Sequence, residues 1–438
     1  MALDRAALCG WYLRNRRRSR AIFDSVAPGA YFERPIPLRN PICFYEGHLP
    51  AFSVNTLVKR GLGRPGVDTA YEVLFERGID PEDHSAVPGG QGSWPSRAAI
   101  LAYGDAADRV VFEALAGADI EQDENPVLRR GLAALTILEH EPMHQETLAY
   151  MWHRLPYDRK VRPADAPAPV CGGEPPRAGV VRIPPGRATL GASPEELSFG
   201  WDNEFPCFVA DVPAFSIDVH SVTNRDFLEF VEAGAYGRAE LWSEEGWRWK
   251  TDNAVAHPLF WERRGVSWVW RGQWEEVPLP PAWPAYVSHA EACAYARWQG
   301  LRLPSEAEYH RAAFGTPEGR ERPFPWGEEP LDQTRGNFDL HSADPVPAGS
   351  HPAGASAWGV HDLVGNGWEW TSTVFEGFPG FAPLASYPNY SADFFDGRHW
   401  VLKGASPLTA KELVRKSYRN WFRGNYPYVY AKFRCAGD

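Results

Sequence analysis

The sequence has no run of apolar residues long enough to cross a membrane. A spanning helix needs about 20 consecutive apolar residues, and no segment of the 438 residues approaches that length. The first twenty residues include Asp4 and Arg5 and contain no long apolar core, so we expect no secretory signal peptide. The sequence therefore predicts a cytoplasmic protein that does not interact with a membrane.

Closely spaced cysteine pairs are also missing. The six cysteines are Cys9, Cys43, Cys171, Cys207, Cys293 and Cys435, and no two of them form a CxxC pair. This scatter is typical of reduced thiols in a cytoplasmic protein, and it argues against a disulfide scaffold.

The sequence also lacks an excess of positive charge. The formal net charge is -11, which disfavours nonspecific attraction to nucleic acid. The one basic run, Arg14–Arg18, lies in a segment with helical periodicity, and we interpret it as a solvated helix face. We therefore expect small molecules as partners, and no nucleic acid.

The chain is long enough for two or three domains, and its composition and residue pattern change along its length. Residues 1–160 have the apolar spacing of amphipathic helices, most regularly between Val127 and Leu155, with Asn125 and Pro126 as a helix start signal. Residues 161–178 are rich in proline and alanine, as linkers are. Residues 179–438 contain short β-like runs and many turns. This pattern predicts an α+β multidomain protein in which a helical bundle precedes a loop-rich domain.

The most regular helical segment contains a histidine pair. His140 and His144 are four residues apart, so both rings leave one helix face and can bind one metal ion. Gln145 and Glu146 are candidates for orienting the two rings. His48, which lies in an apolar and aromatic stretch, is the best candidate for a third ligand. Three imidazoles with open coordination positions suit either iron or catalytic zinc.

The same segment matches the HExxH pattern of zinc hydrolases, in which Glu141 would be the catalytic base. Pro142 weakens this alternative because proline removes a backbone donor and tends to kink a helix. No further ligand is evident downstream, where the proline-rich linker begins. The zinc hydrolase stays an alternative, as does a noncatalytic binding protein.

The C-terminal part resembles the formylglycine-generating-enzyme-like domain, a variant C-type-lectin fold. The resemblance covers about 260 residues and is carried by an ordered series of blocks: Arg182–Gly186, Gly191–Ala192, Trp201–Glu204, Val222–Phe230, Pro284–Ser288, Leu301–Glu308, Phe324–Gly327, Gly365–Thr371, Leu402–Ser406 and Phe433–Cys435. Formylglycine generation needs a pair of C-terminal cysteines, but Pro407 stands where one is expected. That activity is therefore not predicted.

A histidine-bearing bundle in front of this domain resembles the ergothioneine-type sulfoxide synthases, whose N-terminal half is a DinB-like four-helix bundle. In that family three histidines bind Fe(II), and His48, His140 and His144 match them. The resemblance implies an enzyme that uses O2 to join a chalcogen donor to imidazole C2 of hercynine, which is Nα-trimethylhistidine. A tyrosine of the C-terminal domain supplies a proton or electron in the family, and Tyr387 and Tyr390 are the candidates here.

The match to this family departs at the substrate-binding positions. Asn420 and Trp421 are retained and are expected to bind hercynine, but Phe422 and Tyr426 replace an acidic residue and an arginine that hold γ-glutamylcysteine. Met143 stands where these enzymes often have glutamine.

The resemblance also makes Arg97 a candidate substrate-binding residue. Loss of the charged pair at positions 422 and 426 disfavours γ-glutamylcysteine as the donor. We favour a selenosugar, as used by the related selenoneine synthases, with cysteine as the alternative. The enzyme that makes the donor is a further candidate partner.

Overall fold

The computed structural model describes residues 3–76 and 94–438 and divides the chain into two compact units. The first unit contains residues 1–165 and 384–388, and the second contains residues 166–383 and 389–438. The division near residue 165 lies within the linker 161–178 that we expected from composition. The assignment of residues 384–388 to the helical unit was not expected. Within the described residues, no helix has the length and apolar composition of a membrane span.

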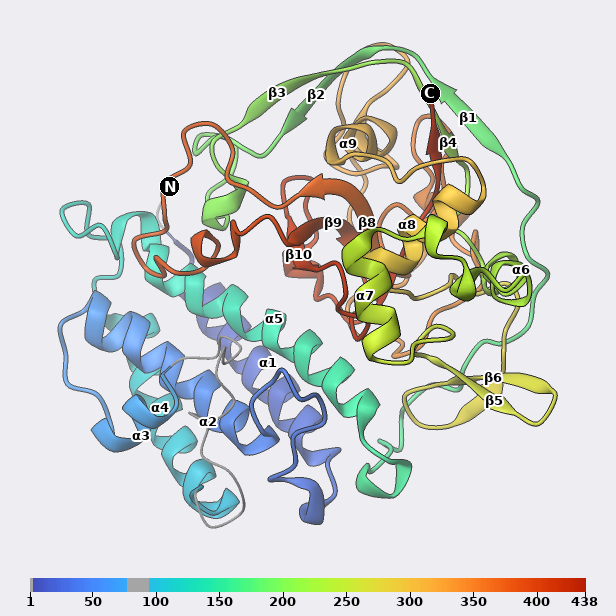
Figure 1. Cartoon of the computed structure of the whole chain (residues 1–438). Helices are drawn as coiled ribbons and strands as arrows, with labels where there is room; N and C mark the ends of the chain where they lie inside the picture. Colours follow the sequence, from blue (N-terminus) through green and yellow to red (C-terminus); the bar gives the residue numbers. More distant parts are fainter. Residues whose placement is uncertain (1–2, 77–93) are drawn as a thin grey trace. The chain divides into compact units, whose positions relative to one another are not determined.

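The first unit is built from helices (Figure 1). They are α1 (Arg5–Asp24), α2 (Ile42–Ser53), α3 (Thr69–Leu74), α4 (Arg97–Gly117) and α5 (Leu132–Arg154), and α2 continues into a π-helical segment, η2 (Val54–Gly61). The side chains of Asp4 and Ser96 accept hydrogen bonds from the backbone at the starts of α1 and α4, which stabilises these helix ends. Helix α1 packs against α4 and α5, and α2 packs against the same two helices. That this unit is a DinB-like bundle stays a prediction.

Helix α5 starts later than the sequence signal indicated. The sequence placed the start at Pro126, but the helix begins at Leu132. Arg130 and Gly131 have positive φ angles of 54° and 73°, so a left-handed turn precedes the helix. The Asn125 side chain caps the turn before the helix and not the helix itself, since its oxygen accepts from the Val127 backbone at 3.0 Å and its amide donates to the Gly61 carbonyl at 2.9 Å.

The second unit contains short strands in several small sheets (Figure 1). One sheet has the order β1 (Val180–Ile183), β4 (Phe215–Asp218), β12 (Ala436–Gly437), and another pairs β2 (Gly186–Leu190) with β3 (Phe208–Val212). A third has the order β5 (Trp261–Arg264), β6 (Ser267–Arg271), β7 (Glu276–Pro278), and a fourth the order β10 (Asn420–Arg423), β9 (His399–Ala405), β8 (Gly367–Val374), β11 (Ala431–Lys432). Only the β11–β8 pairing is parallel among the strands of the described residues.

Four α-helices accompany these sheets in the described residues: α6 (Asn224–Glu232), α7 (Glu244–Asp252), α8 (His289–Trp298) and α9 (Glu306–Phe314). Helix α8 starts with a capping box, in which the Ser288 and Glu291 side chains each bond to the other residue's backbone. This arrangement satisfies two backbone donors at the helix start. The mixture of strands and helices agrees with the predicted α+β class for this part of the chain.

Candidate metal centre

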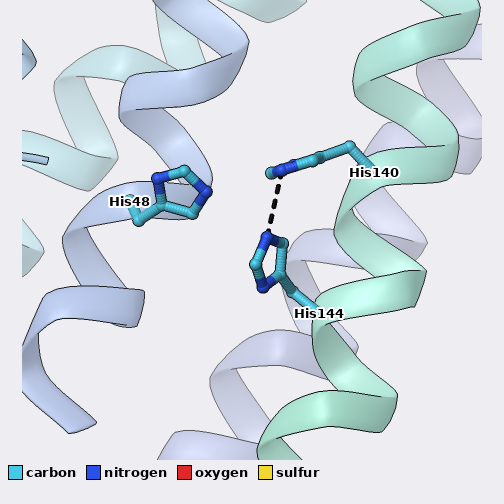
Figure 2. Close-up of side chains that lie close together, drawn as sticks. All are labelled: His48, His140 and His144. Atoms are coloured by element: carbon cyan, nitrogen blue, oxygen red, sulfur yellow. Dashed lines mark hydrogen bonds between the residues drawn. The ribbon is translucent and has the colours of Figure 1, made fainter. Parts of the chain in front are cut away.

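Three histidine side chains meet inside the first unit. His48 comes from α2, while His140 and His144 come from α5. One ring nitrogen of each lies within 4.8 Å of the corresponding nitrogen of the other two, and the Nε2 atoms of His140 and His144 are 3.1 Å apart (Figure 2). The i, i+4 spacing on α5 accounts for one pair, and the packing of α2 against α5 brings the third ring to it.

A backbone carbonyl fixes the orientation of the His48 ring. The Nδ1 atom of His48 lies 2.8 Å from the carbonyl oxygen of Phe75, so Nδ1 carries the hydrogen and donates it. The Nε2 atom is then left with its lone pair, and it is buried without a hydrogen-bond partner among the described residues. A buried acceptor without a partner is costly, and a metal ion would satisfy it.

Burial keeps the three imidazoles neutral. Removal from water lowers the pKa of His48 to about 4, although the Phe75 carbonyl partly opposes this shift. Burial is also the main reason that the pKa values of His140 and His144 lie well below the usual range, and the neighbouring histidines lower them further. Neutral imidazoles are the protonation state that binds a metal ion.

Aromatic rings form the surroundings of the three histidines. Phe52 stacks on His140 with 3.5 Å between ring centroids, and Phe44 stacks on His48 at 5.3 Å. The Tyr45 ring lies 5.7 Å from that of His144. Three neutral nitrogen ligands in such a site leave further coordination positions open, as catalytic iron and zinc sites require.

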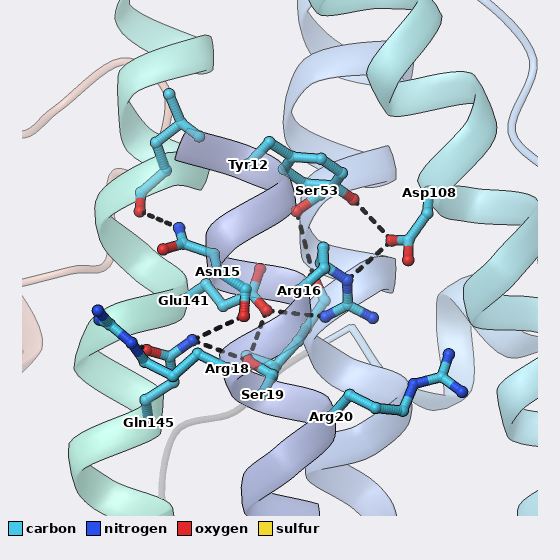
Figure 3. A network of polar contacts seen from close by, with 12 residues as sticks. Tyr12, Asn15, Arg16, Arg18, Ser19, Arg20, Ser53, Asp108, Glu141 and Gln145 are labelled. Carbon is cyan, nitrogen blue, oxygen red and sulfur yellow. Dashed lines mark hydrogen bonds and ion pairs between the residues drawn. The ribbon is translucent and has the colours of Figure 1, made fainter. Parts of the chain in front are cut away.

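Glu141 turns away from the three histidines. Its side chain is buried and accepts hydrogen bonds from Ser19 at 2.6 Å and from Arg16 at 2.9 Å, both on α1 (Figure 3). The carboxylate is therefore held by an ion pair on another face of α5. A zinc hydrolase needs this residue as a base beside the metal-bound water, so the geometry disfavours that alternative.

One of the two residues that we expected to orient the histidine rings has another role. Gln145 was a candidate for orienting the rings, but its amide donates to the Asn15 carbonyl and to the Ser19 hydroxyl. The group that orients a ring is the Phe75 carbonyl. A backbone carbonyl leaves no residue-specific signal, so the sequence could not reveal it. Met143 is half-buried on α5.

The two tyrosine candidates lie in different units. Tyr387 belongs to the first unit, where its ring centroid is 6.2 Å from that of His140 and 5.1 Å from that of Phe52. Its segment is held there by the neighbouring Ser386, whose carbonyl accepts from Arg60 and whose hydroxyl bonds to that of Thr136.

Tyr390 belongs to the second unit and is buried there. Its ring stacks on Trp201 with 4.0 Å between centroids and meets Trp421 edge-on at 5.1 Å. Burial, together with nearby acidic groups and Tyr418, raises the pKa of its hydroxyl well above the usual value. Of the two tyrosines, only Tyr387 is thus placed beside the histidines within one unit.

The predicted substrate-binding residues of the second unit lie on and after β10. Trp421 stacks on Phe375 with 4.3 Å between centroids, and the Asn420 side chain accepts a hydrogen bond from the Trp421 backbone. Phe422 and Tyr426 stack on one another at 5.1 Å. Two of the positions that differ from the family pattern, 422 and 426, therefore form one aromatic pair.

Arg97 starts α4 and is engaged in ion pairs. Its guanidinium donates to Glu46 of α2 at 2.9 Å and to Asp24 at 2.8 Å, and it lies over the ring of Tyr31. Glu46 is two residues from His48, so this ion pair ties α4 to the helix that carries the third candidate ligand.

Comparisons with known proteins cover both units. A family model described as a sulfatase-modifying factor enzyme 1-like domain matches residues 169–438. The chain is 34% identical over 333 residues to the hercynine oxygenase of Mycolicibacterium smegmatis, a match that covers 74% of this chain and 75% of that protein. It is 38% identical over 253 residues to the hercynine oxygenase of Mycobacterium tuberculosis, covering 57% of this chain and 58% of the relative.

A longer match extends over most of this chain. The chain is 29% identical over 492 aligned positions to the ergothioneine biosynthesis protein 1 of Neurospora crassa, which covers 93% of this chain and 55% of that protein. The chain therefore spans between 55% and 75% of the length of these three curated relatives.

Proposed function

We propose that this protein joins a chalcogen donor to C2 of the hercynine imidazole. The premise is that the chain belongs to the family of ergothioneine-type sulfoxide synthases. The reaction uses O2 and an iron(II) ion bound by His48, His140 and His144. The observation that carries this proposal is the convergence of three neutral imidazoles within 4.8 Å, of which those of His48 and His140 are buried and that of His144 is half-buried. Such a set leaves coordination positions open for reactants.

The overall reaction balances with O2 as the only oxidant. One imidazole C–H bond and the hydrogen–chalcogen bond of the donor break, and a carbon–chalcogen bond forms. One oxygen atom is added to the chalcogen, and the other leaves as water with both hydrogen atoms. Iron(II), when bound, supplies the redox chemistry that lets O2 react with an otherwise inert imidazole C–H bond.

The residues of this chain then have distinct roles. Tyr387, whose ring lies 6.2 Å from that of His140, is proposed to move a proton at its hydroxyl oxygen during the reaction. Asn420 and Trp421 are proposed to bind hercynine. An indole face attracts a quaternary ammonium group, and hercynine carries one.

The aromatic pair Phe422 and Tyr426 supports a donor without an amino-acid head group. A hydrogen bond to a charged group contributes roughly 1.5–3 kcal/mol. The Phe422 side chain can form none, and the uncharged Tyr426 hydroxyl cannot form the ion pair that an arginine forms with a carboxylate. A hydroxyl-rich selenosugar needs no such partner and can pack on the two stacked rings. We therefore propose a selenosugar as the donor, with cysteine as the alternative and γ-glutamylcysteine as the poorest of the three.

A competition experiment tests the donor. Purified protein, iron(II), O2 and hercynine are mixed with the selenosugar, cysteine and γ-glutamylcysteine together, and the products are identified by mass spectrometry. We expect the selenosugar product to dominate. If the cysteine product dominates, the assignment to selenium is wrong, and if the γ-glutamylcysteine product dominates, the role given to positions 422 and 426 is wrong.

The double variant Phe422→Asp, Tyr426→Arg sharpens this test. Restoring both charges should raise kcat/KM for γ-glutamylcysteine by at least about tenfold, since one charge-assisted hydrogen bond accounts for that factor. The same change should lower kcat/KM for the selenosugar. Iron content serves as the control and should equal that of the unmodified protein.

A further inference from the structure

Each helix that carries a candidate ligand has a proline two residues after a histidine. His48 is followed by Pro50 in α2, and His140 is followed by Pro142 in α5. Proline has no N–H group, so the carbonyl four residues earlier loses its helical hydrogen bond. Helix α2 passes into the π-helical segment η2 soon after its proline, whereas α5 remains α-helical to its end. In α5 the missing bond falls on the carbonyl of Leu138, beside the turn that carries His140.

Asn15 of α1 supplies the missing hydrogen bond. Its side-chain amide donates to the Leu138 carbonyl at 2.8 Å. Asn15 is only 2% exposed and Leu138 is fully buried, so water cannot replace the amide. A buried carbonyl needs a hydrogen-bond donor. Asn15 provides it, although it lies more than a hundred positions before Leu138 in the sequence.

The same residue also contacts α5 beyond the second histidine. The backbone carbonyl of Asn15 accepts a hydrogen bond from the Gln145 amide at 3.0 Å, and Gln145 directly follows His144. Gln145 also donates to Ser19, whose hydroxyl donates to Glu141 (Figure 3). Asn15 thus holds α5 at two points, one before His140 and one after His144.

We propose that Asn15 is a positioning residue for the metal centre and that it acts through the hydrogen bond that Pro142 removes from α5. The inference rests on the proposed function only in taking His140 and His144 as metal ligands. Their Nε2 atoms are 3.1 Å apart, and both must reach one ion at about 2 Å. A helical turn that lacks a backbone bond can tilt, and a small tilt separates the two nitrogen atoms from their common ligand position.

The test is a double-mutant cycle on the full chain, with the dissociation constant for Co(II) under anaerobic conditions as the readout. Asn15→Leu keeps the approximate volume and removes the donor, and it should weaken Co(II) binding by at least about tenfold. In Pro142→Ala, residue 142 regains an N–H that can bond the Leu138 carbonyl. Adding Asn15→Leu to that variant should then change the affinity by less than about twofold.

Two further measurements separate positioning from a general loss of stability. The visible absorption bands of the Co(II) protein depend on ligand geometry, so Asn15→Leu should alter them and the double variant should restore them. Asn125→Leu is the matched control, because it removes another amide-to-carbonyl bond of the first unit, the one to Gly61. It should leave both the affinity and the absorption bands unchanged.

The proposal is overturned if Asn15→Leu leaves Co(II) binding unchanged, or if it weakens binding equally with Pro142 and with Ala at that position. If Asn15→Leu does not fold but the double variant folds and binds Co(II), the proposal is supported. If the double variant does not fold although Pro142→Ala alone folds, the proposal is wrong.

Failure of the proposed metal site has a different signature. In that case His140→Ala and His144→Ala each bind Co(II) as tightly as the unmodified protein does. Positioning of a metal centre is then also wrong, while coupling between Asn15 and Pro142 in the thermal unfolding of the metal-free chain would still report their shared hydrogen bond.

Discussion

In the described part of the chain, two helices carry a histidine and a second potential metal ligand four residues later. In the first unit α5 carries His140 and His144, and in the second unit α8 carries His289 and Cys293. Both helices bury the histidine, and burial is the main cause of a lowered pKa for both His140 and His289. Spacing and burial alone therefore do not distinguish the two pairs.

The difference lies in what the remaining polar atoms contact. On α8 the Nε2 atom of His289 lies 3.1 Å from the Thr371 carbonyl, its ring stacks on Trp400 at 4.1 Å, and burial raises the pKa of Cys293 to about 12. That shift disfavours the thiolate, which is the form of cysteine that binds a metal ion.

On α5 a third imidazole arrives from α2, with a buried Nε2 that has no hydrogen-bond partner among the described residues. The three histidines are also the only group of three potential ligands found close together in the described residues. The comparison teaches that an i, i+4 pair becomes a candidate metal site when a further helix brings a third free lone pair to it.

The largest expected effect separates the two pairs directly. His48→Ala should lose bound iron and reduce turnover by at least about 100-fold, because even residues that only support metal ligands cost up to that factor. His289→Gln should retain the iron content of the unmodified protein. Iron is measured by elemental analysis and turnover by product formation. Equal iron loss in the two variants would show that the contacts described above do not distinguish the α5 pair from the α8 pair.

A smaller effect is expected at the tyrosines that lie in different units. Tyr387→Phe should lower kcat by about 100-fold, the usual size of a proton-transfer contribution, without changing iron content. Tyr390→Phe should lower kcat less, because that hydroxyl is buried among Trp201, Trp421 and Tyr418. Steady-state kinetics with hercynine provide the measurement. A larger kcat loss in Tyr390→Phe would reverse our assignment.

The smallest effect concerns the pH dependence that His289 gives to the second unit. Burial lowers the pKa of His289 to about 3, below the value of about 6.5 in an unfolded chain. Between these values the unfolded chain binds a proton that the folded unit does not, so the free energy of unfolding decreases as the pH falls.

Protonation of His289 in the unfolded chain should lower the free energy of unfolding by about 1 kcal/mol when the pH falls from 7 to 5.5. His289→Gln cannot take up that proton, so its free energy of unfolding should change less over the same interval. Urea denaturation at the two pH values, followed by tryptophan fluorescence, is the measurement. An unchanged pH dependence in the variant would show that His289 is protonated in the folded unit.

Part of this organisation could be predicted from the sequence. The apolar spacing between Val127 and Leu155 predicted the helix that became α5, although its start was placed too early because the left-handed turn at Arg130 and Gly131 was not recognised. The ordered blocks after residue 179 predicted the matching family model for residues 169–438. The three histidines were named as candidates, and the structure brings them together.

Other features could not be read from the sequence. The Phe75 carbonyl that orients His48, the Asn15 amide that replaces the bond lost at Pro142, and the membership of Tyr387 in the helical unit all involve partners distant in the chain. The sequence by itself determined the spacing of His140 and His144, because residues four apart on an α-helix always share a face. Only the tertiary structure decided that a third ring meets them and that their helix is held in place. Those contacts depend on how separate helices pack, and no local periodicity encodes that.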